Sequence, residues 1–157
     1  MHPALAAGAF VLALLPIGAA DWGHYENDRF GFSIDVPPRF VAQGESYNGD
    51  GNRFTTPTAE LRAFAGNLVE ESFEEEAATG QSVLSDDGYA ITYQATTPRF
   101  AVMSGRKGGR VLYERLVAIC GTDAFMGFSL EYSVADLKAF DAIIDRLTAS
   151  LKPPAKC

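Results

Sequence analysis

Side chains that commonly carry out chemistry at neutral pH are sparse in this chain of 157 residues, which has two histidines and two cysteines. His2 belongs to an apolar N-terminal segment, so His24 is the one histidine left in the remainder. A zinc site would have to combine His24 with Cys120, Cys157 and a carboxylate, at spacings that match no common zinc finger. A serine or cysteine nucleophile would need the same histidine, and the chain has no G-x-S-x-G motif. We therefore expect no metal and no cofactor, and we interpret His24 as an exposed histidine.

A calcium site is the next possibility, because Asn48, Asp50 and Asn52 have the spacing of the first three ligands of an EF-hand loop. The sixth position of such a loop should be glycine and is Arg53, and the twelfth should be glutamate and is Ala59. This mismatch excludes an EF-hand. The Asn-Gly and Asp-Gly pairs in this stretch instead predict a structured turn, with a weak, irregular calcium site as the alternative.

The stretch 105–110, G-R-K-G-G-R, concentrates positive charge. It lacks the G-x-x-x-x-G-K-[ST] pattern of a phosphate-binding loop, and no helix is predicted to follow it. It predicts a hairpin tip, which on an acidic protein is a candidate contact surface. The predicted binding residues are therefore those of this tip together with the polar turn described above: Arg106, Lys107, Arg110, Asn48 and Asp50.

Two other polar groups suggest enzymatic alternatives. Five glutamates between positions 70 and 76 could supply paired carboxylates, but a block of like charges is typical of a solvated helix face. Tyr113, Glu114 and Arg115 could form a carboxylate- or tyrosine-based site. If they lie in a strand, however, Tyr113 and Arg115 share one face and Glu114 lies on the other. A deep pocket containing Glu114 would favour this alternative, and a closed surface would exclude it.

The stretch 27–38, N-D-R-F-G-F-S-I-D-V-P-P, predicts the strand around which the fold is built. Its apolar residues Phe30, Phe32, Ile34 and Val36 alternate with polar or small ones, which is the pattern of a half-buried strand. Two prolines then end the strand, since proline cannot donate to a sheet ladder.

Later segments predict one α+β domain. Residues 72–79 predict a short acidic helix that is capped by Ser72 and ended by Gly80. Residues 134–151 predict an amphipathic helix with Ser133 as its N-cap. Its apolar positions, which we expect to pack on the sheet, are Leu137, Phe140, Ile143, Ile144, Leu147 and Leu151. Short strands joined by turns predict an antiparallel meander at 53–56, 59–65, 89–95, 100–104, 110–120 and 124–132, and residues 39–52 predict a loop.

The N-terminus predicts export. Residues 1–20 contain no acidic residue, lysine or arginine, and their apolar run is too short to span a bilayer. Gly18 and Ala20 suit a signal peptidase, so we expect cleavage after Ala20 and a mature domain of residues 21–157 in the periplasm or outside the cell. An uncleaved membrane anchor is the alternative.

Export and an even number of cysteines favour a disulfide between Cys120 and Cys157. If the terminal helix packs back along the sheet, its C-terminal tail returns to the level of the turn beside Cys120. The alternative is a buried thiol at Cys120 and an unpaired one at Cys157.

The net charge of the chain limits the classes of partner that it could bind. A net charge of −7 argues against nucleic acid and anionic membranes, which repel an acidic protein. We expect a monomer that binds an unknown protein or small molecule.

The order of the motifs R-F-G-F-S-I, N-G-D-G, G-Y-x-I-T-Y, S-G and Y-E-R resembles small exported proteobacterial proteins of unassigned function. More distantly, the chain resembles the Mog1/PsbP-like fold, an antiparallel sheet flanked by helices. The resemblance implies a binding or assembly factor, and it carries over no catalytic residue. We therefore favour a non-catalytic exported binding domain. A small periplasmic enzyme and a structural envelope protein are the alternatives.

Overall fold

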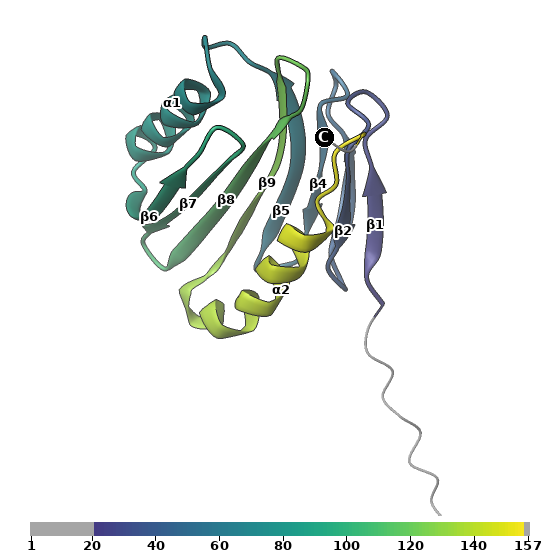
Figure 1. Ribbon diagram of the computed structural model, residues 1–157. Helices are drawn as coiled ribbons and strands as arrows, with labels where there is room; N and C mark the ends of the chain where they lie inside the picture. Colours follow the sequence, from purple (N-terminus) through teal and green to yellow (C-terminus); the bar gives the residue numbers. More distant parts are fainter. Residues whose placement is uncertain (1–20, 156–157) are drawn as a thin grey trace, which may run out of the picture.

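The computed structural model describes residues 21–155, so the predicted signal peptide and Cys157 lie outside the described residues (Figure 1). No helix in this part of the chain is long and apolar enough to cross a membrane. The elements follow in the order β1 (Gly23–Glu26), β2 (Ser33–Val36), β3 (Val41–Glu45), β4 (Gly51–Thr55), β5 (Glu60–Asn67), α1 (Phe73–Asp86), β6 (Ala90–Thr96), β7 (Phe100–Lys107), β8 (Arg110–Ile119), β9 (Ala124–Ser133), the 3-10 helix η1 (Val134–Asp136) and α2 (Leu137–Ser150).

Seven of these strands form one antiparallel sheet in the order β3-β4-β5-β9-β8-β7-β6, while β1 and β2 form a separate hairpin. The predicted meander is confirmed for β6 to β9. The strand before them, β5, pairs with β9 instead of with β6. α1 links β5 to β6 at the far edge of the sheet, and as a result β9, the last strand of the chain, lies beside β5 at the centre of the sheet.

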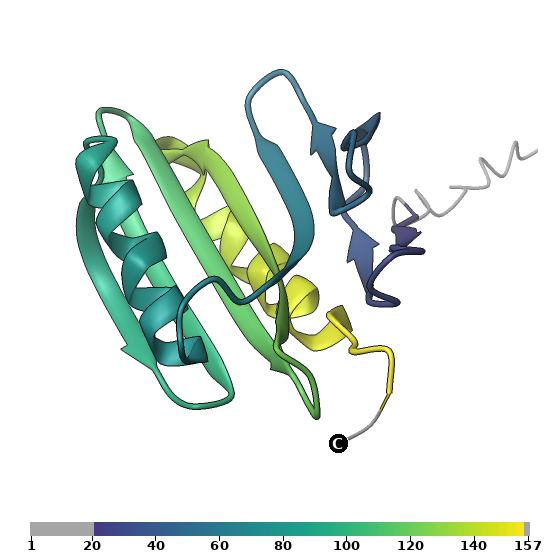
Figure 2. The ribbon, with the colours of Figure 1, turned by 90° about the horizontal axis from the view of Figure 1, so that it is seen from above.

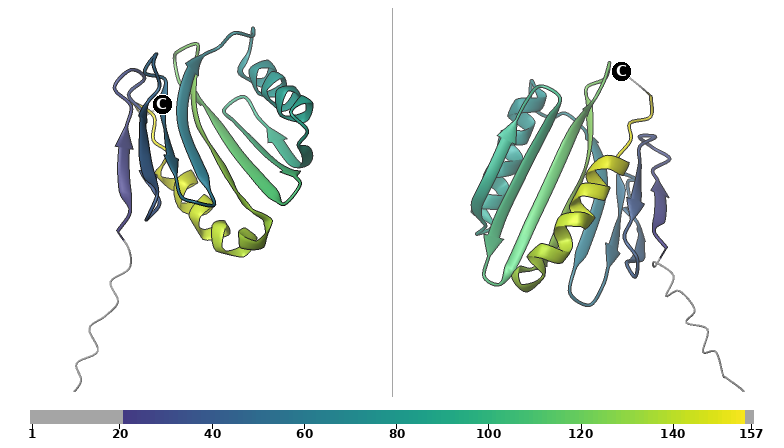
Figure 3. Two further views of the ribbon diagram at one scale, coloured as in Figure 1. Left: turned by 180° about the vertical axis from the view of Figure 1, so that it is seen from behind. Right: turned by 60° about the horizontal axis from the view of Figure 1, so that its bottom comes forward.

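α2 covers one face of the sheet, as predicted (Figure 3, right). All six predicted apolar positions of the terminal helix contact or belong to the main core, which also includes Leu61, Phe128 and Leu130. The β1–β2 hairpin closes the far side of this core, and Lys152 bridges to Ser33 just beyond α2. This face of the sheet therefore serves the stability of the domain.

The strand predicted from Phe30 begins later than expected. Asn27 accepts a hydrogen bond from the Phe30 backbone N–H at its side chain and one from Gly31 at its carbonyl, both at 2.8 Å, so the preceding residues form a turn. Phe32 and Ile34 are completely buried, as expected for core residues. Phe30 is only partly buried and packs against the core from its edge.

Two strands were not predicted. β1 lies before the expected first strand, and β3 lies in the segment expected to be a loop. Every residue of β3 is exposed, so its sequence carries no apolar alternation from which a strand could be recognised. It is ordered by backbone pairing with β4 at the edge of the sheet.

α1 packs on the face opposite α2 (Figure 2). Ser72 caps it as predicted, with its hydroxyl accepting from the Glu75 backbone N–H at 3.2 Å. The predicted end at Gly80 is wrong, because the helix continues to Asp86 and ends before Gly88, whose φ of +92° suits glycine. Its buried Phe73 and Ala77 form a second small cluster over β7 and β8, and this leaves the neighbouring part of the same sheet face uncovered.

Candidate functional site

The uncovered part of this sheet face holds a cavity of about 800 Å³. Its floor comes from β5, β8 and β9, and its walls come from α1 on one side and the β3–β4 hairpin on the other. Polar residues of the β3–β4 turn, charged residues of β4 and β5, and a few apolar side chains line it together. We name this feature the sheet-face cavity.

Glu114 and Ser129 lie side by side on the floor. They are direct partners across the β8–β9 ladder, and adjacent partners in a sheet present their side chains on the same face. Ser129 is only 9% exposed. Within the part of the chain that the structure describes, neither side chain has a hydrogen-bond partner. The floor therefore offers two polar groups that the protein itself leaves unpaired.

Burial raises the pKa of Glu114 from its ordinary value of 4.5 to about 7. The cause is the loss of water around the carboxyl group, since Ala77 and Gln81 of α1 and Leu116 of β8 border it on the side away from the cavity. Solvent still reaches the carboxyl group through the cavity, and the residue as a whole is only partly buried. At neutral pH the protonated and the ionised forms of the Glu114 carboxyl group are therefore about equally populated.

In contrast, the arginines that line or border the cavity pair with the glutamates Glu60 and Glu131. The two carboxylate oxygens of Glu60 take Arg62 Nε at 2.5 Å and Arg53 at 3.6 Å. Glu131 accepts from Arg110 Nε at 2.9 Å and from the Tyr89 hydroxyl at 2.7 Å. Burial acts to raise the pKa of Glu131, but these two hydrogen bonds hold it below its ordinary value. Glu131 is therefore ionised at neutral pH while Glu114 is balanced between its two states.

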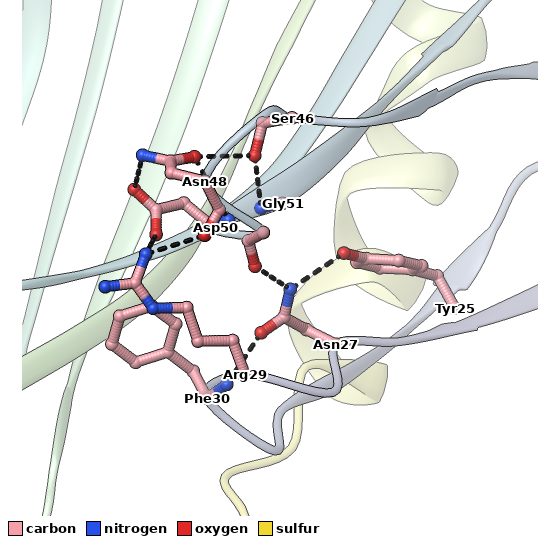
Figure 4. Close-up of polar contacts among 9 residues, drawn as sticks. Tyr25, Asn27, Arg29, Phe30, Ser46, Asn48, Asp50 and Gly51 are labelled. Atoms are coloured by element: carbon pink, nitrogen blue, oxygen red, sulfur yellow. Dashed lines mark hydrogen bonds and ion pairs between the residues drawn. The ribbon is translucent and has the colours of Figure 1, made fainter.

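The predicted binding residues Asn48 and Asp50 border the cavity, and they also stabilise their own turn (Figure 4). Arg29 donates to the Asn48 carbonyl at 2.7 Å and pairs with the Asp50 carboxylate. The buried Asn27 donates to the Gly49 carbonyl at 2.8 Å. The turn that forms one wall of the cavity is thus fixed by residues that precede β2, about 20 positions earlier in the chain.

The predicted basic tip does not form a single surface. Lys107 and Arg110 are paired across β7 and β8 and face the cavity side, whereas Arg106 is paired with Val111, a residue of the main core. Lys107 donates to the Asp87 carbonyl and lies over the Tyr89 ring at 5.5 Å. Lys107 and Arg110 thus both have contacts within the domain. Binding of a partner by these residues stays a prediction.

Tyr113 and Arg115 face away from Glu114, as their alternation in the strand predicted. The Tyr113 ring stacks on Phe128 with centroids 5.8 Å apart, and the Arg115 guanidinium lies 4.7 Å from the centre of the Phe100 ring. The three residues therefore cannot act on one ligand. Glu114 alone lies in a pocket, which is the feature that would keep an enzymatic alternative open.

Sequence reasoning identified Glu114 only as part of that trio and missed Ser129 completely. Ser129 lies within the apolar strand 124–133, where it reads as a single polar residue between Phe128 and Leu130. A polar residue facing outward from a central strand is ordinary, and only the pairing of β8 with β9 places it beside Glu114. Glu60, Arg62 and Glu131 were missed for the same reason.

His24 lies in β1, outside the cavity. Its Nδ1 is 3.3 Å from the Asp35 carboxylate, which Arg146 also contacts at 3.0 Å. Among the described residues, no group of three or more histidine, cysteine or acidic side chains could hold a metal ion.

The fold is α+β and Mog1/PsbP-like: an antiparallel sheet with a C-terminal helix on one face and a second helix on the other. The comparison with solved structures agrees. Cyanobacterial PsbP (CyanoP) from Synechocystis sp. PCC 6803 superimposes with a TM-score of 0.66 at 10% identity, covering 88% of this chain and 95% of that one. The Saccharomyces cerevisiae Ran-binding protein Mog1p gives a TM-score of 0.63 at 8% identity, covering 87% and 97%. No protein-family model and no curated protein matches the sequence.

Proposed function

We propose that the chain is an exported, non-catalytic binding domain whose ligand occupies the sheet-face cavity. One observation carries the proposal: Glu114 and Ser129 lie unpaired on the floor of a cavity, whereas the lining carboxylates Asp50, Glu60 and Glu131 are each paired with an arginine. Leaving a buried polar group without a partner costs about 1–3 kcal/mol, so such groups tend to be retained where a ligand completes them. The volume of about 800 Å³ also lies within the usual range of ligand sites.

Two further observations support the proposal. One of the fold neighbours is named as a Ran-binding protein, which agrees with a binding role for this architecture. The uncharged, apolar segment at residues 1–20 supports export through a cleaved signal peptide. The working state in this proposal is a monomer in the periplasm or outside the cell.

Filling the cavity tests the proposal. Ser129→Phe adds an aromatic ring to the floor, and Ala142→Phe adds the same ring to the exposed surface of α2 on the opposite face. Mature wild-type protein and both variants are incubated with extract from the native compartment, recovered, and analysed for retained molecules by mass spectrometry. We expect the wild type and Ala142→Phe to retain the same compounds and Ser129→Phe to lose them. A wild type that retains nothing beyond Ser129→Phe would overturn the proposal.

An enzyme that uses Glu114 as a general acid or base is the second candidate. The observation in its favour is the pKa of about 7, which suits proton transfer at neutral pH. Against it, the other cavity carboxylates Glu60 and Glu131 are held by arginines, and no histidine lines the cavity in the described part of the chain. Turnover of any retained compound by the wild type, and its loss in Glu114→Gln, would favour the enzyme.

A further inference from the structure

The chemistry of the cavity indicates which kind of ligand would complete it, if the cavity is the binding site proposed above. The floor presents a carboxyl group and a hydroxyl group side by side, from Glu114 and Ser129. An ionised carboxylate only accepts hydrogen bonds, and a serine hydroxyl accepts up to two while donating one. The group that satisfies both is therefore a donor.

The balance of charge on the lining favours a cation. Five carboxyl groups border the cavity, from Asp50, Glu60, Asp87, Glu114 and Glu131, against two guanidinium groups. Both guanidinium groups, those of Arg53 and Arg62, already contact Glu60. Arg110, which lies beside the cavity, donates to Glu131 and to the Thr58 carbonyl at 2.7 Å. Arg29 likewise pairs with Asp50. An anionic ligand would therefore have to separate one of these pairs, whereas a cation can pair with Glu114 without doing so.

The uncharged part of the lining favours a ligand with an apolar body. Phe64 of β5, Leu112 of β8 and Leu84 of α1 border the same cavity, and they come from three different elements around the floor. Leu112 is two positions from Glu114 on the same strand, so its side chain lies on the same face. A ligand bound at Glu114 therefore has apolar side chains beside it.

We propose that the sheet-face cavity binds a small molecule that carries an ammonium group on an apolar body, with the ammonium group donating to Glu114 and Ser129 and the body lying against Leu112 and Phe64. A hydrogen bond between an ammonium group and a carboxylate is charge-assisted, and it gains strength where water is scarce. The restricted hydration that raises the pKa of Glu114 therefore also makes its ionised form a strong partner for a cation. A compound of this size fits the volume of about 800 Å³, which is within the range of small-molecule sites.

Three probes that share a phenylethyl body and differ in charge test the inference: 2-phenylethylamine, 2-phenylethanol and 3-phenylpropanoate. Each is titrated at neutral pH into the ¹⁵N-labelled mature protein, up to about 20 mM, which detects affinities in the millimolar range. The proteins are the wild type, Glu114→Gln, Ser129→Ala and Asp145→Asn. The last variant removes one carboxylate from the exposed side of α2, on the other face of the sheet, and is the control for net charge.

We expect the amine to shift the backbone signals of residues around Leu112, Glu114 and Ser129 in the wild type and in Asp145→Asn, with equal affinity. Glu114→Gln keeps the size of the side chain and removes its charge, so it should weaken amine binding at least about tenfold. Ser129→Ala should weaken it by a smaller factor, about threefold, because it removes one neutral acceptor. The alcohol and the carboxylate should bind at least about tenfold more weakly than the amine.

The other outcomes overturn the inference, and they separate it from the proposed function. Equal binding of the amine and the alcohol, tighter binding of the carboxylate, or unchanged amine binding in Glu114→Gln would each show a cavity that binds ligands without selecting a cation. In those cases the proposed function stands. Absence of any shift around the cavity with all three probes also overturns the inference. The capture experiment with Ser129→Phe then decides the proposed function independently.

Discussion

Glu114 and Ser129 face each other across the β8–β9 ladder, and both line the sheet-face cavity. The two strands otherwise pair mainly apolar residues with one another, as Leu116 with Gly127 and Tyr113 with Leu130 show. Gly127 allows the two strands to approach closely at this point, because a Cβ atom there would lie 2.5 Å from the Arg115 carbonyl oxygen. The Glu114–Ser129 pair is therefore a polar exception at the centre of the sheet.

Glu114→Gln should stabilise the protein at high pH. The folded pKa of about 7 lies above the ordinary 4.5, so the wild type loses stability as the pH rises from 4.5 through 7. The full difference between these two pKa values corresponds to about 3 kcal/mol, because one pKa unit is equivalent to 1.36 kcal/mol. Glutamine has no charge to bury, so the free energy of unfolding of the variant should exceed that of the wild type by about 3 kcal/mol at pH 8.

Urea unfolding of both proteins between pH 4 and pH 8 measures this difference. At pH 4 the two curves should nearly coincide, since Glu114 is then neutral in both folded and unfolded states. Asp145→Asn should track the wild type at every pH. A constant gap between Glu114→Gln and the wild type across the range would contradict the assignment of the raised pKa to Glu114.

Asn27→Ala should destabilise the domain by about 3 kcal/mol, because it leaves several buried groups unpaired. Asn27 is 2% exposed and donates to the Tyr25 hydroxyl at 3.0 Å and to the Gly49 carbonyl at 2.8 Å. It also accepts from the Phe30 backbone N–H. The midpoint of urea unfolding measures the loss. Asn48→Ala is the matched control, since Asn48 is exposed and water can replace its contacts, and it should cost less than about 1 kcal/mol.

Phe32→Ala should cost roughly 3–5 kcal/mol, the range for removing a fully buried aromatic ring from a core. The Phe32 and Tyr25 rings pack edge to face with their centroids 5.9 Å apart. Removal of the Phe32 ring would therefore leave a void in the core beside the β1–β2 hairpin. Phe30→Ala, which removes the same ring from a partly buried position, should cost less than half as much. Chemical denaturation decides between them, and a loss below about 1 kcal/mol for Phe32→Ala would mean that the core is misassigned.

The disulfide between Cys120 and Cys157 remains a prediction, because Cys157 lies outside the described residues. Cys120 is exposed directly after β8. A bridge would close a loop of about 38 residues and stabilise the domain by about 4 kcal/mol on the chain-entropy model. The intact mass of the exported protein should rise by two hydrogen atoms on reduction, and its melting temperature should fall. Two free thiols in the unreduced protein would end this prediction.

The predicted contact role of the basic tip is tested by the double change Arg106→Ala and Lys107→Ala. If the tip binds a protein partner, a periplasmic pull-down with the variant should lose that partner. The structure adds a way to separate the two residues, because Arg106 and Lys107 are neighbours in a strand and point to opposite faces. Single changes should then show which face is used. An unchanged set of partners in the double variant would contradict the assignment.

Local patterns in the sequence determined much of the fold. The alternation of Leu61, Ala63 and Ala65 with Glu60, Arg62 and Phe64 predicted the strand β5, since side chains in a strand alternate between faces whatever the partner strand. The helical spacing from Leu137 to Leu151 identified α2 and its apolar side for the same local reason. The cap at Ser72 could also be predicted, because it depends on a contact with Glu75, only three residues further along the chain.

The tertiary structure decided what depends on residues far apart in the chain. Pairing of β5 with β9, instead of with β6, brings Glu60 opposite Glu131 and creates the floor of the cavity. Pairing of β8 with β9 places Ser129 beside Glu114, although neither residue stands out from its own strand. The raised pKa of Glu114 comes from the helix above it, because hydration depends on everything that surrounds a group and not on its neighbours in sequence. The sequence alone therefore determined the elements and their buried faces, while only the order of strands in the sheet determined the site.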